Sequence, residues 1–131
     1  MKYLLDTGVW LWTLDESERI NPEARQLIAE GREELYLSAV SSWEISIKWA
    51  LGKLRLPLPP ARLVPKSVAT QGIRPLPITH IHALGVSTLP LHHRDPFDRL
   101  LIAQARAEEM TILTADRAFR RYRVEVFWCG S

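Results

Sequence analysis

The sequence predicts an α/β fold in which helices cover both faces of a short central parallel sheet. Short apolar runs of strand length alternate with longer segments of helical periodicity almost throughout the chain. The 131 residues, 47% of them hydrophobic and 24% charged, are enough to form one domain with its own core. No internal repeat, low-complexity tract or glycine-rich phosphate loop interrupts the alternation. We therefore expect residues 1–131 to form a single α/β/α sandwich.

The first half of the chain contains two short strands and three helical segments. An apolar run stops at the turn signal Asp6-Thr7-Gly8, which is typical of a buried strand that ends in a turn. Asn21 and Pro22 are typical of the cap and the first position of a helix. We expect a strand at 3–5, a helical turn at 9–14, a helix from 22 to Gly31, a strand at 35–37, and a serine-capped helix that Gly52 ends.

The second half of the chain begins with a connection and carries the most informative helix. Four prolines between residues 56 and 65 mark the connection, from which a helix starts near Pro60. Residues 73–78 resemble an edge strand, because the two prolines there cannot donate to a central ladder. Asp95 and Pro96 are a typical cap and first position of another helix. The remaining expected elements are a short helix capped by Thr79, a strand at 111–113, a basic helical turn at 117–122 and a strand at 124–128.

Three aspartates fall where these elements meet the carboxyl edge of the sheet. Asp6 and Asp116 each directly follow a predicted strand, and ligands bind at this edge in open parallel sheets. Asp98 lies in the first turn of its helix, at the head of the apolar stripe. Each also has a purely structural interpretation, as a turn residue, as a helix cap, or as one half of a capping box with Asp95.

Glu44 occupies a helical position where the pattern asks for an apolar side chain. Val40, Glu44, Ile47 and Leu51 recur at spacings of four, three and four, which places the glutamate in the predicted buried stripe. Burying a carboxylate is costly unless it is paired or bound to a metal. The alternative is an ordinary surface pair with Lys48, four residues further along the helix.

Convergence is the simplest explanation for the placement of these acids, because separate capping roles would not require them all to face one edge. Carboxylates close together repel one another unless protons or divalent cations enter. Hard cations such as Mg²⁺ and Mn²⁺ prefer oxygen ligands and are commonly completed by substrate phosphates. Candidate ligands for such an ion are Asp6, Glu44, Asp98 and Asp116.

Other metal and redox chemistry is disfavoured. His80, His82, His92 and His93 show no H-x-x-x-H spacing and have no cysteine partner, so we expect exposed or locally bonded histidines rather than zinc ligands. Cys129 is the only cysteine and cannot form an intramolecular disulfide. The chain has no signal peptide and no apolar run of the about 20 residues that span a bilayer, so we expect a cytoplasmic protein without a membrane segment.

The formal net charge of +2 is too small to indicate nucleic acid by itself. Positive charge is nevertheless concentrated in the last third of the chain, at Arg94, Arg99, Arg106, Arg117, Arg120, Arg121 and Arg123. These side chains can be solvated helix faces or contacts to a nucleic-acid backbone.

Four segments of the chain resemble PIN-domain ribonucleases of the VapC toxin type. They are Asp6-Thr7 after the first strand, Ser41-Ser42-Trp43-Glu44 in a helix, D-P-F-D-R-L-L-I-A-Q-A at 95–105, and Leu113-Thr114-Ala115-Asp116. The likeness covers nearly the whole chain, and 95–105 is its most specific part. Gly8 departs from the pattern, because many such toxins carry a bulkier residue after Asp-Thr, but no ligand is lost by it.

The resemblance implies a PIN-like sandwich and an endoribonuclease toxin that uses Mg²⁺ or Mn²⁺. Asp6 and Asp98 match the family's expected direct ligands, Asp116 a ligand through water or at a second metal, and Glu44 a ligand or base. Thr114 is expected to orient Asp116 by hydrogen bonding. The clustered arginines would contact the RNA backbone. A homodimer and a small antitoxin partner that blocks the acidic cleft are also implied.

Two other functions are compatible with the residues alone. In a non-catalytic RNA- or protein-binding module of the same fold, the acids would serve as caps and the basic face would dock on the partner. A metal-dependent phosphatase acting on small molecules usually carries a D-x-D pair after the first strand, and Gly8 stands where the second acid would be. Loss of Asp98 separates the first alternative from a nuclease, because it would leave binding unchanged.

Overall fold

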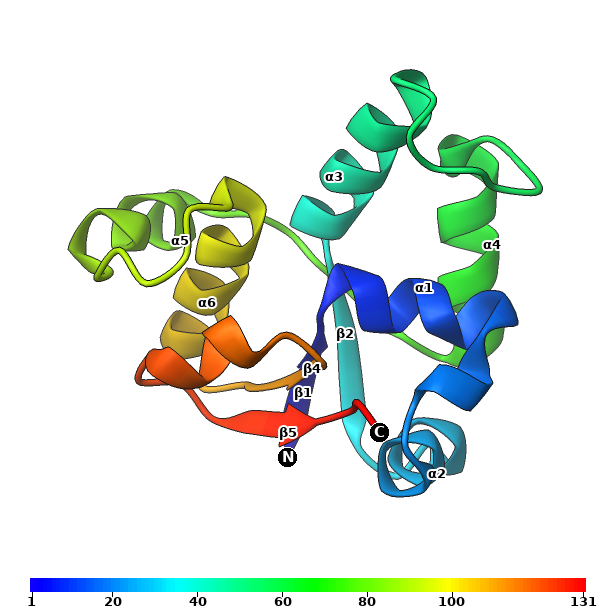
Figure 1. Cartoon of the computed structure of the whole chain (residues 1–131), viewed down its shortest axis with the longest axis horizontal. Coiled ribbons are helices and arrows are strands. Elements are labelled where there is room, and N and C mark those ends of the chain that lie inside the picture. Colours follow the sequence, from blue (N-terminus) through cyan, green and yellow to red (C-terminus); the bar gives the residue numbers. More distant parts are fainter.

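The computed structural model describes residues 1–131, and a five-stranded sheet lies at its centre (Figure 1). All four strand pairings are parallel, and the strand order is β3-β2-β1-β4-β5. The strands are β1 (Lys2–Leu5), β2 (Glu34–Ser38), β3 (Arg74–Leu76), β4 (Thr111–Thr114) and β5 (Val126–Trp128). The predicted α/β fold with a short parallel sheet is confirmed, and β3, which contains Pro75, is the predicted edge strand.

Six α-helices connect and cover the strands. They are α1 (Thr7–Asp15), α2 (Pro22–Glu30), α3 (Ala39–Ala50), α4 (Pro60–Gln71), α5 (His80–Gly85) and α6 (Pro96–Glu108), with short 3-10 turns η1 (Ser17–Arg19), η2 (Val86–Thr88) and η3 (Arg117–Arg121). The expected caps are present: the Asn21 side chain accepts a hydrogen bond from the amide of Ala24, and Thr79 caps α5. Gly72 adopts the left-handed conformation, with φ of 69°, that ends α4. None of the helices is long and apolar enough to cross a membrane.

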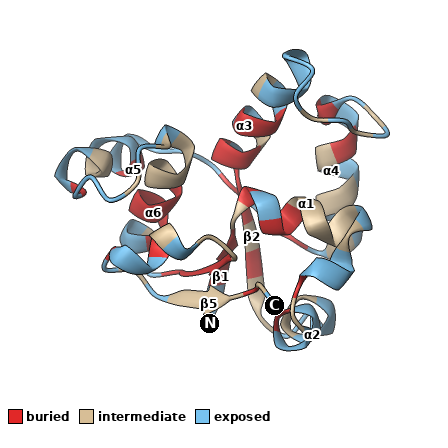
Figure 2. Ribbon diagram, viewed as in Figure 1, coloured by how far each residue is buried: buried red, intermediate tan, exposed pale blue.

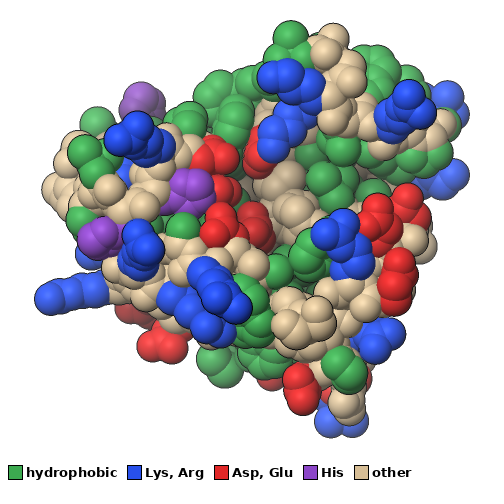
Figure 3. All heavy atoms as spheres, in the orientation of Figure 1, with side chains coloured by type: hydrophobic (Ala, Val, Ile, Leu, Met, Phe, Trp, Pro, Cys, Tyr) green, Lys and Arg blue, Asp and Glu red, His purple; other side chains and the backbone are tan.

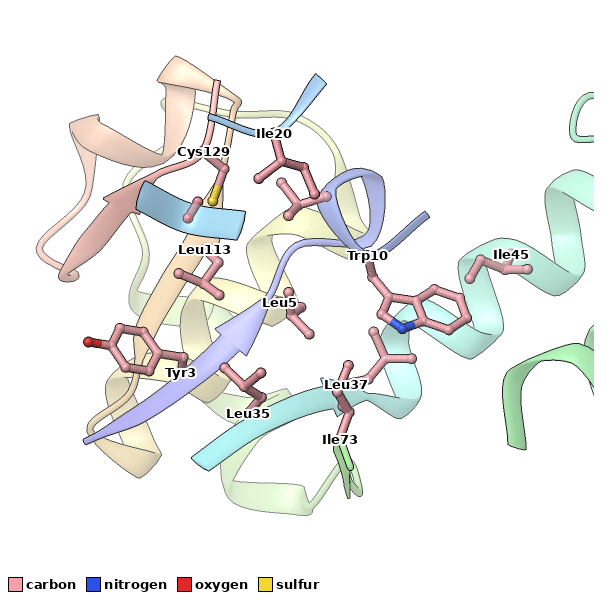
Figure 4. Packing of buried hydrophobic residues seen from close by; sticks show 12 residues of the cluster. Tyr3, Leu5, Trp10, Ile20, Leu35, Leu37, Ile45, Ile73, Leu113 and Cys129 are labelled. Carbon is pink, nitrogen blue, oxygen red and sulfur yellow. The ribbon is translucent and has the colours of Figure 1, made fainter. Parts of the chain in front are cut away.

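The sheet separates two hydrophobic cores, which the helices close from opposite sides (Figure 2). Strand β1 contributes to both, because Tyr3 and Leu5 face one core while Leu4 faces the other. The first core packs against α1 and α2 around the fully buried Trp10 (Figure 4). The second lies under α6, from which the fully buried Leu101 points toward the sheet. The result is a three-layered arrangement of helices, sheet and helices.

The chain reverses its direction across the sheet between β1 and β4. From β1 it proceeds through β2 to the edge strand β3, then returns to place β4 on the other side of β1. Helix α1 follows β1 into one core, whereas η3 follows β4 and places Phe119 in the other. The amide of Asp6 donates to the carbonyl of Leu113 at 2.9 Å and joins the two strand ends. Such a switch point leaves a crevice at the carboxyl ends of the strands.

The structure corrects one detail of the sequence prediction. The buried face of α3 consists of Val40, Ser41, Glu44 and Ile45, whereas Leu51, predicted to lie in the buried stripe, is 64% exposed. The first turns of α3 pack on neighbouring elements, while its last turn projects beyond the sheet (Figure 1). The helix expected to start near Pro60 is α4, and it contains Pro65, whose ring nitrogen cannot donate a helical hydrogen bond.

Candidate metal centre

The structure brings the four predicted acids together at the switch point. Asp6 follows β1, Asp116 follows β4, Glu44 lies on α3 and Asp98 lies in the first turn of α6. Figure 3 shows acidic side chains gathered in a hollow of the surface between α3 and α6. The negative charges interact strongly enough that Asp6, Glu44 and Asp116 all raise the pKa of Asp98. Four separate segments thus converge on one site.

Asp6 is held by the neighbouring central strand. Its Oδ2 accepts a hydrogen bond of 2.8 Å from the Thr114 hydroxyl, which in turn accepts one of 3.0 Å from the amide of Asp116. Thr114 was expected to orient Asp116, but its hydroxyl proton goes to Asp6, and it touches Asp116 only at the backbone. Burial raises the pKa of Asp6 to about 6, and Glu44 and Asp116 add to this rise while the Thr114 donor opposes it.

Glu44 is the acid whose environment is least satisfied by the protein. Its side chain is buried, with 5% of the residue exposed, although one oxygen, Oε2, pairs with Lys48 as expected for residues four apart. The other oxygen, Oε1, is buried and has no hydrogen-bond partner. A hydrogen bond of 2.7 Å between the hydroxyls of Thr7 and Ser41 ties α3 to α1 beside it. An unpartnered buried carboxylate oxygen is costly, and a cation would satisfy it.

Asp98 and Asp95 share the start of α6 but have different roles. Asp95 is the predicted cap, because its Oδ1 accepts hydrogen bonds from the amides of Phe97 at 2.8 Å and Asp98 at 3.4 Å. The Asp98 side chain instead points into the acidic hollow and is only 13% exposed. Burial raises its pKa to about 8, and the charges of Asp6, Asp95 and the other acids contribute in the same direction.

Asp116 is the most exposed of the four acids, with 42% of its side chain accessible. Its Oδ1 accepts a 2.9 Å hydrogen bond from the amide of Ala118 and caps η3, as the structural interpretation of this residue predicted. Its Oδ2 lies 3.1 Å from Nε2 of His93. The cap and the position at the acidic hollow therefore coexist in one side chain.

His93 is a site residue that the sequence reasoning missed. It was expected to be exposed or only locally bonded, but its Nε2 lies 2.8 Å from Oδ2 of Asp98 and 3.1 Å from Oδ2 of Asp116. Its Nδ1 accepts a 3.2 Å hydrogen bond from the amide of Asp95, so the proton of the neutral ring is on Nε2. His93 therefore donates to Asp116 and lies in close contact with Asp98. In the sequence, its position two residues before the Asp95 cap could have pointed to this role.

The arginines of the last third divide into two groups. Arg99 donates to the carbonyl oxygens of Pro90, Val86 and Leu89 at 2.8–3.3 Å, so it holds the loop before α6 rather than being free for RNA. This corrects its place among the expected RNA contacts. The exposed members are Arg94, Arg106, Arg117, Arg120, Arg121 and Arg123.

The described geometry agrees with one family of known proteins. The family model for the PIN domain matches residues 3–125. This chain belongs to the PIN-domain family. Its PIN domain is 30% identical over 123 residues to Ribonuclease VapC22 of Mycobacterium tuberculosis, an alignment that covers 92% of this chain and 91% of that protein. It is 42% identical over 60 residues to Ribonuclease VapC16 of the same organism, covering 46% of this chain and 43% of that one.

Solved structures show the same PIN fold. VapBC2 from Rickettsia felis, bound to a DNA fragment from its promoter, contains a chain that matches with a TM-score of 0.75 at 14% identity, covering 98% of this chain and 99% of that chain. FitAcB from Neisseria gonorrhoeae matches with a TM-score of 0.64 at 25% identity, covering 95% and 96%. The first likeness is one of fold alone, because sequence identity is low.

Proposed function

We propose that this PIN domain is a metal-dependent endoribonuclease and the toxin component of a toxin-antitoxin pair. The observation that carries the proposal is the buried, unpartnered Oε1 of Glu44 among three further carboxylates, Asp6, Asp98 and Asp116. The names of the two related ribonucleases support RNA as the substrate. Hydrolysis of a phosphodiester bond requires that negative charge be stabilised, which a carboxylate-bound Mg²⁺ or Mn²⁺ provides.

The residues present fit a hard divalent cation. All four candidate ligands offer carboxylate oxygen, and burial, together with the neighbouring carboxylates, raises the pKa values of Asp6 and Asp98. Asp6, Glu44 and Asp98 would hold the ion from the buried side, and Asp116 lies toward solvent. When bound, the ion supplies Lewis acidity and lowers the pKa of a coordinated water.

The protein's own residues prepare this site. Thr114 fixes the orientation of Asp6, and Lys48 holds one oxygen of Glu44 while the other stays buried and unpartnered. Such supporting contacts orient ligands and commonly change metal affinity about 10- to 100-fold when removed. Of the exposed arginines, Arg94 and Arg117 directly follow His93 and Asp116 in the chain and would contact phosphates beside the scissile bond, a binding contribution that weakens as salt rises. Arg106 and Arg123 instead line a hollow with Met1 and Thr111, at the opposite end of the strands.

Two protein partners complete the proposal. Several structural neighbours are VapBC assemblies, which supports an antitoxin as partner. A hollow beside α1, lined by Leu11, Trp12, Leu54, Leu56 and Leu63, offers apolar surface for a partner segment. Exposed apolar side chains on α3 and around α5 supply surface for a second copy of the chain; they are Trp43, Ile81, Leu84 and Leu91.

The first test is cleavage of a structured RNA by chain purified free of any partner. Cleavage in Mg²⁺ or Mn²⁺ is expected to disappear with excess chelator and with Asp98→Asn. Asp15→Asn is the matched control, because Asp15 is an exposed acid at the end of α1 and is not one of the four acids of the acidic hollow. Persistent cleavage by Asp98→Asn would refute the assigned site. RNA binding without cleavage under any condition would favour the binding module instead.

A further inference from the structure

Two contacts of the imidazole and one of the backbone amide fix His93 in place. Its Nδ1 accepts the Asp95 amide at 3.2 Å, and its own amide donates to the Tyr122 hydroxyl at 2.8 Å. The ring also packs edge-to-face against Phe119, with ring centroids 6.3 Å apart and an interplanar angle of 82°. Phe119 is fully buried, so this support is rigid. The Nε2–H donor is therefore held toward the acidic hollow by contacts that involve none of the four acids.

The Nε2 atom lies close to two carboxylates, and its proton is donated to that of Asp116. It is 2.8 Å from Oδ2 of Asp98 and 3.1 Å from Oδ2 of Asp116, and these three atoms all lie within 4.8 Å of one another. Three such groups can resemble a metal site. With its proton on Nε2, however, His93 has no lone pair to offer there. The ring occupies the position of a cation between the two acids.

We propose that His93 is a positioning residue that takes the place of a second divalent cation between Asp98 and Asp116, so that this centre binds one ion. The inference deepens the proposed metal centre and rests on it. Asp6, Glu44 and Asp98 hold the one ion, and Asp116 is fixed by His93 and by the Ala118 amide at 2.9 Å. Asp116 then acts at the solvent side without direct ligation.

Sterics and charge both support one ion. A Mg²⁺ or Mn²⁺ ion bridging the two Oδ2 atoms would need to approach each within about 2.1 Å, the space that the imidazole N–H fills. In two-metal nuclease sites the ions are about 3.5–4 Å apart and share carboxylates. Here one of the four acids, Glu44, is also paired with Lys48, which reduces the negative charge available to a second ion.

The test is the number of Mn²⁺ ions bound per chain, measured by titration calorimetry and by the loss of the free-ion electron paramagnetic resonance signal. The native chain is expected to bind one ion. His93→Ala, with its fold checked by circular dichroism, is expected to bind two, because the space and both Oδ2 atoms become free. His92→Ala is the matched control and should still bind one, since His92 is exposed and its ring faces Tyr122 instead.

A second comparison does not depend on the folding of His93→Ala. In the native background, Asp116→Asn should keep one bound Mn²⁺ with affinity changed less than about tenfold, whereas Asp98→Asn should weaken it at least about 100-fold. Two ions on the native chain, one ion on well-folded His93→Ala, or equal losses in Asp116→Asn and Asp98→Asn would each overturn the role of His93. No ion on the native chain would instead overturn the metal centre itself.

Discussion

Two histidines, one at each end of α6, have the same hydrogen-bonding pattern but different surroundings. His82 accepts the Thr79 amide on Nδ1 at 3.1 Å and contacts Glu108 through Nε2 at 2.8 Å. His93 accepts the Asp95 amide on Nδ1 at 3.2 Å and contacts Asp98 through Nε2 at 2.8 Å. In each case a backbone amide fixes the proton on Nε2 and directs it at a carboxylate.

The difference lies in what surrounds the carboxylate. His82 is 1% exposed and belongs to a fully paired group, in which Gln104 also contacts its Nδ1 and the Pro77 carbonyl. His93 faces acids that crowd one another beside the unpartnered oxygen of Glu44. A polar cluster whose groups are all hydrogen-bonded stabilises the fold. A cluster with unpaired groups is less stable by itself and gains interactions when a ligand binds.

The largest expected effect is a difference in RNA cleavage between substitutions of Asp98 and Glu108, the carboxylates that contact His93 and His82. Asp98→Asn should reduce RNA cleavage by about 100-fold or more, because it removes a carboxylate charge of the proposed metal centre. Glu108→Gln should leave the cleavage rate within about twofold, because the amide oxygen still accepts from His82. Initial rates at saturating Mn²⁺ measure both. Comparable losses of cleavage in the two variants would show that Asp98 is no more important for activity than Glu108.

Removing His82 should affect stability more than removing His93. His82→Ala should lower the free energy of unfolding by about 3 kcal/mol, because it leaves a cavity and unpaired buried groups. His93→Ala lies in a more exposed position and should cost about 1 kcal/mol or less. Urea denaturation in chelator gives both values. Cleavage per folded molecule should be preserved in His82→Ala, and a selective loss of activity there would contradict its structural role.

Acidity should stabilise the metal-free chain. In the unfolded chain aspartates have a pKa of about 3.9. In the folded chain the pKa of Asp6 is raised to about 6 and that of Asp98 to about 8. The folded state therefore binds protons more tightly, and its stability falls as the pH rises through this window. Unfolding in chelator should be easier at about pH 8 than at about pH 5 by on the order of 2 kcal/mol.

Added Mg²⁺ should reverse this trend, because it replaces the protons and binds better as the acids ionise. Melting curves with and without Mg²⁺ across this pH range provide the measurement. Stability that rises with pH in chelator would contradict the raised pKa values. Asp98→Asn should flatten the dependence, whereas Asp15→Asn should not.

The smallest expected effect concerns Thr114. Thr114→Val keeps the shape of the side chain but removes the donor to Asp6 and the acceptor for the Asp116 amide. Mn²⁺ affinity should fall about tenfold, the lower end for a residue that orients a ligand. Thr114→Ser retains the hydroxyl and should stay near the native affinity. If both variants bind Mn²⁺ equally well, the hydroxyl does not position Asp6.

Sequence alone predicted the elements and the gathering of the acids, because strand runs, caps and breakers are local signals. Asn21, Pro22 and Asp95 start helices where expected. The error at Leu51 arose because periodicity cannot reveal where a helix leaves the body of the protein. His93 and Arg99 were misjudged for a related reason, since their partners depend on how the loop before α6 folds back. Thr114 lies between two acids, and only the structure shows which accepts its proton.

The order of the strands has a consequence for synthesis of the protein. Strand β4 lies beside β1 in the middle of the sheet, yet it is made only after residue 110, and Asp116 comes later still. The Asn21 side chain, near the start of the chain, donates to the carbonyls of Trp128 and Gly130. Contacts this distant in sequence form late. A ribosome therefore carries a growing chain whose acidic group is incomplete, and the four acids can come together only once residues 111–128 have emerged and docked.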